Sequence, residues 1–167
     1  MIKNFAVLIV LLMSVAAFSG DTLGVAKIDG LVCPFCANNL KKKLDAISWI
    51  HSVSIQIDDG LANFTIKAGE YPNISEIKKA IKTGGFSPGK VRLTVQGSVK
   101  KSKKSVYFVF SKNFELIIDP NKQRRQLLKE KNIGSAIIHI EGIANTVSGK
   151  THILIEKYHL AKGVTKE

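Results

Sequence analysis

The sequence is poor in the residue types on which most catalytic sites depend. Its 167 residues include two cysteines and four histidines, and 7% are aromatic. No Ser, His and Asp set and no pair of carboxylates has a context that argues for hydrolysis. Acidic residues are also scarce, with 13 Asp and Glu against 25 Lys and Arg, so the formal net charge is +12. We therefore expect a basic protein that is not an enzyme.

Only one long apolar run is present, and it lies at the N-terminus. Residues 5–18 follow Lys3 and precede Ser19, which is the three-part pattern of a secretory signal peptide. The run is shorter than the ~20 residues of a membrane-spanning helix, and no other stretch approaches that length. No cysteine follows it, so a lipid-modified N-terminus is not indicated. We expect cleavage of residues 1–19 and a periplasmic or secreted protein, with an uncleaved anchor as the alternative.

Export changes how the charge and the cysteines are interpreted. An exported protein seldom meets nucleic acid, so nucleic acid is not an expected partner despite the lysine excess. The lysines either form solvated faces or dock the protein to an acidic partner or an anionic envelope surface. A disulfide also becomes chemically accessible in an oxidising compartment.

Residues 20–95 show strand and helix patterns in a regular order. Strands are predicted at 23–31, 49–58, 61–68 and 90–95, and helices begin at Pro34 and Ser75. Asp59-Gly60 predicts a hairpin, and residues 86–89 predict a turn. The order β-α-β-β-α-β predicts a ferredoxin-like α+β domain, in which two helices cover one face of a four-stranded antiparallel sheet.

Residues 96–162 are expected to form a second domain, followed by a tail at 163–167. Strands at 91–99, 105–110, 114–118, 135–143 and 151–160, with a helix over 121–131, follow the order of a five-stranded OB-like barrel. Gly97 and Gly142 lie where such a small barrel needs bends. Tyr107, Phe108 and Phe110 either form a ligand-binding face or belong to the core, and the core interpretation is favoured.

The two cysteines, Cys33 and Cys36, have C-x-x-C spacing at the junction of the first strand and first helix. Such a pair can hold a soft metal ion, cycle between dithiol and disulfide, or form a static disulfide. The helix N-terminus lowers thiol pKa values, and lysines 41–43 favour thiolates further.

The stretch Gly30-Leu31-Val32-Cys33-Pro34-Phe35-Cys36 resembles the G-M-x-C-x-x-C loop of heavy-metal-associated domains. These domains occur in copper chaperones, in metal-transporting ATPases and in the periplasmic mercury-binding protein. The resemblance covers residues 23–95 and includes Gly85-Phe86, which matches the end of that family's second helix. Leu31 replaces the family's Met, and Pro34-Phe35 is less typical of copper chaperones.

This resemblance implies that Cys33 and Cys36 bind one soft ion as thiolates. Cu(I) or Hg(II) is favoured, because two sulfurs can hold either ion in a near-linear site. Zn(II) is a third candidate and is less favoured, because it prefers four ligands. Leu31 is implied to pack beneath the loop. Phe86 is either a lid over the site or a core aromatic. The partner is implied to be a metal donor or acceptor protein or a transporter, with an acidic surface to meet the lysines.

Two alternatives remain open from the sequence. In the first, the protein is a non-catalytic envelope adaptor in which Cys33 and Cys36 form a disulfide and the OB-like barrel binds the ligand. A thiol–disulfide oxidoreductase is less favoured. Cys-Pro-Phe-Cys is similar to the glutaredoxin motif, but no Thr-Val-Pro stretch follows it, and a hairpin after the first helix is the wrong order for that family.

Overall fold

The computed structural model describes residues 22–111 and 114–161, so the expected signal peptide and the tail at 163–167 lie outside the described residues. The chain is a mixed α+β protein, as predicted, and none of the helices described is long and apolar enough to cross a membrane. The elements, in chain order, are β1 (Leu23–Asp29), α1 (Pro34–Asp45), β2 (Ile50–Gln56), β3 (Leu61–Ile66), α2 (Ile74–Thr83), β4 (Ser87–Lys101), β5 (Val106–Ser111), β6 (Phe114–Ile118), α3 (Lys122–Leu127), β7 (Ile138–Val147) and β8 (Lys150–Leu160).

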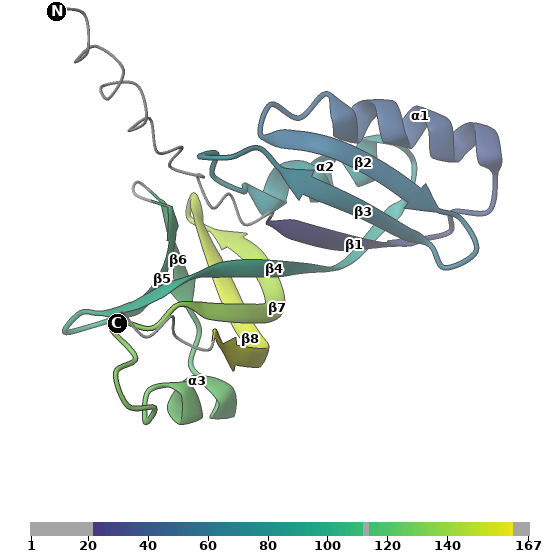
Figure 1. Ribbon diagram of the computed structural model, residues 1–167. Helices are drawn as coiled ribbons and strands as arrows, with labels where there is room; N and C mark the ends of the chain where they lie inside the picture. The colour runs from purple at the N-terminus through teal and green to yellow at the C-terminus, as the bar shows by residue number, and fades with distance from the viewer. Residues whose placement is uncertain (1–21, 112–113, 162–167) are drawn as a thin grey trace, which may run out of the picture.

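The first module is a four-stranded antiparallel sheet covered on one face by α1 and α2 (Figure 1). The sheet order is β2-β3-β1-β4. Each helix buries one stripe of apolar residues at helical spacing, which drives its packing on the sheet. In α2 this stripe is Ile74, Ile77 and Ile81, all fully buried, and in α1 it includes Leu40 and Leu44.

The second module is a closed five-stranded barrel. Its strands follow the order β4-β5-β6-β8-β7, and pairing of β7 with β4 closes the circle. All pairs are antiparallel except β6 and β8, which run parallel. The barrel interior is filled by apolar side chains such as Phe108, Leu116 and Ile153, each fully buried. Alternation along the strands therefore encloses a packed core.

One long strand, β4, belongs to both modules (Figure 1). It pairs with β1 over residues 87–94, with β7 over residues 91–97 and with β5 over residues 98–101, so residues 91–94 have a partner strand from each module. The expected domain boundary between residues 95 and 96 falls inside this strand. Val91 and Leu93 lie in one continuous core with residues of both modules.

Predicted boundaries of β1, β2 and β3 are wrong by one or two residues, and three other predictions are wrong in ways that affect the connections. Residues 87–89 of the turn expected at 86–89 belong to β4, because Ser87 and Pro88 pair with Asp29 and Ile28 next to a register shift in β1. The third helix ends at Leu127 and not at residue 131. The fourth barrel strand begins at Ile138 and not at residue 135. In the first case long-range pairing overrides the local pattern, whereas residues 132–136 form local turn hydrogen bonds before β7.

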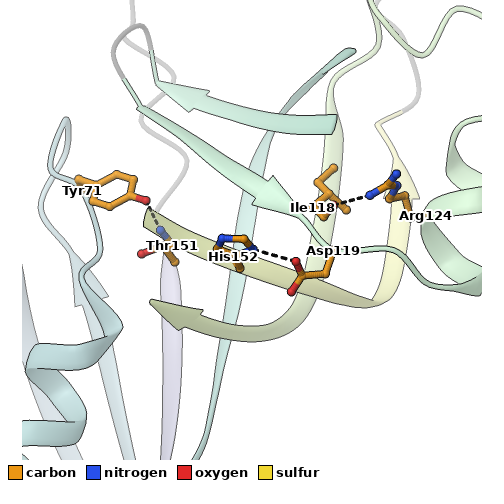
Figure 2. A network of polar contacts seen from close by, with 6 residues as sticks. All are labelled: Tyr71, Ile118, Asp119, Arg124, Thr151 and His152. Atoms are coloured by element: carbon orange, nitrogen blue, oxygen red, sulfur yellow. Dashed lines mark hydrogen bonds and ion pairs between the residues drawn. The ribbon is translucent and has the colours of Figure 1, made fainter. Parts of the chain in front are cut away.

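A polar seam fixes the two modules against each other. Thr151 is fully buried, and its hydroxyl donates a hydrogen bond to the carbonyl of Pro72 at 2.6 Å. Its backbone N–H donates to the hydroxyl of Tyr71, as Figure 2 shows. The N–H of Ile74, at the start of α2, donates to Oγ1 of Thr146 at 2.9 Å. Because these bonds link the loop before α2 to β7 and β8, the modules are held together by more than the shared strand.

We expect Thr151→Val to destabilise the protein by about 1–3 kcal/mol, because the carbonyl of Pro72 would lose its buried donor. Urea denaturation measures this loss. Thr94→Val is the matched control, since Thr94 is exposed on β4, and it should change the free energy of unfolding by less than about 0.5 kcal/mol. Equal effects of the two substitutions would show that the hydrogen bond from Thr151 to Pro72 contributes nothing to the free energy of unfolding.

Candidate metal site

The cysteine loop is short and its backbone is specified at both ends. Gly30 ends β1 with φ of +86°, a conformation that residues with a Cβ rarely adopt. Cys33 is the N-cap of α1 with extended backbone angles, and Pro34 occupies the first turn, where its missing N–H costs nothing. The carbonyl of Cys33 accepts from the N–H of Ala37 at 3.0 Å. Both cysteines therefore lie at the N-terminus of α1, where the sequence predicted them.

The two thiols differ in acidity because they share a proton. The pKa of Cys33 is lowered, chiefly by a hydrogen bond from the Cys36 thiol and further by backbone N–H groups of Cys36 and Phe35. The pKa of Cys36 is raised, chiefly because its proton is held in that same bond to Cys33 and also because of desolvation. The Cys33 side chain is thus the first to become a thiolate. The first turn of α1 contains no acidic residue to oppose this.

The thiols are accessible from solvent. Cys33 and Cys36 are both free cysteines of intermediate exposure. Val32, which precedes Cys33, and Phe35, which precedes Cys36, are each 85% exposed. Leu31 is only 4% exposed and belongs to the core, which is the position the resemblance implies for it. The loop therefore rests on a buried leucine and presents its sulfur atoms outward. The sequence did not predict that Val32 is exposed, because an apolar residue next to a strand is normally expected to be buried.

Phe86 follows α2 and is partly buried against the core. Its N–H donates to the carbonyl of Ile81 at 3.1 Å, and nearby Gly84 packs against Leu40 of α1. These contacts tie the end of α2 to the helix that the cysteines begin. Whether the Phe86 ring covers the thiols remains a prediction.

The other polar residues considered from the sequence do not join the thiols. Lys41 forms an ion pair with Asp45 at 2.5 Å, whereas Lys42 and Lys43 are exposed. His152 lies in the barrel and contacts Asp119, 2.8 Å from Nδ1 to Oδ1 (Figure 2). Among residues 22–111 and 114–161, no group of three or more His, Cys, Asp or Glu side chains is arranged to hold a metal ion. Any ion at the loop would meet two protein ligands.

The aromatic residues of β5 have different environments. Phe108 is fully buried in the barrel, which agrees with the core interpretation. Phe110 is partly buried and stacks on Phe114, with ring centroids 6.1 Å apart. Tyr107 lines a shallow hollow together with Tyr71 and Phe114. The contribution of Tyr71, from the first module, was not visible in the sequence.

We expect iodoacetamide to modify Cys33 several-fold faster than Cys36 in the reduced, metal-free protein between about pH 7 and 8.5. The reason is the lowered pKa of Cys33, which gives it the larger thiolate fraction at any pH in this range. Fragment-ion mass spectrometry of the single peptide that carries both residues measures the two rates. Faster modification of Cys36 would contradict the assigned order of acidity.

No known family model and no curated protein matches the chain. Similar solved structures include a CopZ metallochaperone, with 18% identity over 40% of this chain and 98% of that chain, at a TM-score of 0.37. The yeast copper transporter domain Ccc2A, solved in apo and Cu(I)-loaded states, has 19% identity over 41% of this chain and 92% of that chain, at 0.35. A copper-binding domain from HMA7, a P-type ATPase, has 18% identity over 42% and 92%, at 0.37. These are distant likenesses.

Proposed function

We propose that this protein binds one soft metal ion through Cys33 and Cys36 and passes it to a partner protein. The observation that carries the proposal is the thiol pair itself: two accessible sulfurs at a helix N-terminus, one of them with a lowered pKa. Both protons leave when an ion binds, and thiolates are the ligands that soft ions prefer.

Cu(I) and Hg(II) fit the donor set better than Zn(II). Two sulfurs supply a near-linear site, which satisfies Cu(I) or Hg(II), whereas Zn(II) binds four ligands in structural sites. The described residues offer no further group of ligands at the loop. We therefore propose Cu(I) or Hg(II) as the ion, with Zn(II) bound more weakly.

Transfer follows from the openness of the loop. Because the ion would have two protein ligands and the thiols are accessible, a thiolate of a partner can approach it and replace Cys33 and Cys36 in turn. The partner is proposed to be a metal donor, acceptor or transporter protein. The exposed Lys42 and Lys43 favour an acidic docking surface on it. No catalytic activity is proposed.

The barrel is proposed to be an OB-like module. Its strand order, the parallel pair of β6 and β8, and the helix between β6 and β7 support that assignment. The N-terminal apolar run supports export to the periplasm or the exterior after cleavage near Gly20. Comparing the mass of the protein from the envelope with that of the full chain tests the cleavage.

Native mass spectrometry of the reduced protein, titrated separately with Cu(I), Hg(II) and Zn(II), tests the function. We expect one Cu(I) or Hg(II) per chain and weaker retention of Zn(II). A thiol count on protein isolated without reductant tests the alternative of an envelope adaptor with a Cys33–Cys36 disulfide. No bound ion, together with a disulfide that resists mild reductant, would favour that alternative. Turnover of a disulfide substrate would favour an oxidoreductase.

A further inference from the structure

Segments distant in sequence meet at one end of the barrel. The end of β4 contacts the segment after α3, where Nζ of Lys101 lies 3.4 Å from the carbonyl oxygen of Leu128. The start of β7 pairs with the end of β8 at Ile138 and Leu160. The N–H of Ala161 donates to the carbonyl of Ile137 at 2.9 Å. Figure 1 shows this end near α3, away from α1.

The exposed charge at this end is positive. We define the basic end by its exposed lysines and exposed aliphatic residues, which are Lys101, Lys103, Lys104, Lys129, Lys131, Ile137 and Leu160. None of the ion pairs recorded for the described residues includes these lysines.

The acidic residues nearest in the chain already have partners. Glu115 pairs with Lys100 at 2.7 Å, and Glu130 accepts a hydrogen bond from the hydroxyl of Tyr158 at 3.0 Å. Glu130 keeps its negative charge, because its partner is a neutral hydroxyl. Five lysines against this one carboxylate leave a net positive charge that can interact with an external anion.

Two exposed aliphatic side chains lie where β7 begins and β8 ends, beside the part of β4 that leads to Lys101. Ile137 is 52% exposed and Leu160 is 40% exposed, and their chain segments are hydrogen-bonded neighbours. A purely ionic partner would leave this apolar surface in water. Single-stranded nucleic acid would use exposed aromatic rings for stacking, and the basic end contains none among the described residues. A lipid surface satisfies both features, with phosphates for the lysines and an acyl boundary for the aliphatic groups.

We propose that the basic end binds the surface of an anionic lipid bilayer. The lysines contact headgroup phosphates, and Ile137 and Leu160 enter the boundary between headgroups and acyl chains. Because α1 lies away from the basic end, the first module would face away from a membrane bound at that end (Figure 1). This inference does not depend on metal binding.

Co-sedimentation of the full chain with vesicles tests it, using vesicles of about 30% phosphatidylglycerol in phosphatidylcholine at about 0.15 M salt. Vesicles of phosphatidylcholine alone measure any binding by the apolar run at residues 5–18. The test variant replaces four lysines of the basic end by Gln at 103, 104, 129 and 131. The control replaces four exposed lysines of the first module by Gln at 42, 43, 79 and 82, so that both variants have the same net charge.

We expect the test variant to lose about tenfold or more in affinity for anionic vesicles and the control to lose much less. Ile137→Ser with Leu160→Ser should weaken the salt-resistant part of the binding. Equal losses in test and control variants would overturn the proposal, because diffuse charge would then account for the binding. Unchanged binding of the serine variant, or tighter binding of the wild-type protein to oligo-dT than to vesicles, would also overturn it. Circular dichroism confirms that each variant is folded.

Discussion

Cys33→Ser should abolish the one-to-one complex with Cu(I), lowering affinity by at least roughly 1,000-fold, because a serine hydroxyl is a hard ligand that stays protonated. Cys33 is the thiol with the lowered pKa, so its loss removes the first thiolate to form. Cys36→Ser should have a comparable effect, since neither sulfur alone can complete a two-ligand site. Titration in competition with a chromophoric Cu(I) chelator measures the affinity.

Val32→Ser is the matched control for this loss. It places the same hydroxyl in the same loop, at a position 85% exposed, and leaves both thiols intact. Its stoichiometry and affinity should remain within a few-fold of the wild-type values. If Cys33→Ser still bound one Cu(I) as tightly as Val32→Ser, the ion would have to lie elsewhere and the proposed site would be wrong.

Gly97→Ala should destabilise the protein by more than about 3 kcal/mol, because a methyl group has no room at that position in the barrel. A Cβ built on Gly97 would overlap the carbonyl oxygen of Val109 and lie 2.9 Å from Cε1 of Phe108. Both atoms belong to β5, whose antiparallel pairing with β4 begins at the next residue, Ser98. A shift of the β5 backbone would disturb its pairing with β6. Thermal unfolding followed by circular dichroism measures the loss.

Gly134→Ala provides the comparison. No atom lies within 4 Å of a Cβ built on Gly134, which is exposed between α3 and β7 and has no positive φ. This substitution should be neutral or stabilise by up to about 1 kcal/mol, since it reduces the freedom of the unfolded chain. A Gly97→Ala protein as stable as Gly134→Ala would show that β4 and β5 can separate without cost.

The candidate site was predictable because its signals are local. Gly30, the C-x-x-C spacing and Pro34 all lie within residues 30–36 and act through backbone angles and the helix terminus, which neighbouring residues determine. The acidity order of the thiols was not predictable from the sequence. It depends on the direction of the hydrogen bond between Cys36 and Cys33, which is a property of their geometry.

The sequence by itself determined the elements, their order and the α+β class, because strand alternation and helical spacing are read over short windows. It also marked Gly97 and Gly142 as bends of the barrel, whereas the structure shows that a Cβ at either position would meet the backbone of a neighbouring strand. Only the tertiary structure showed which segments, distant in sequence, contact one another. In it, β4 belongs to both modules, Thr151 is buried against Pro72, and lysines of two segments lie at one end of the barrel. The pairing of distant strands and loops depends on which surfaces exclude water together, and no short window of sequence contains that information.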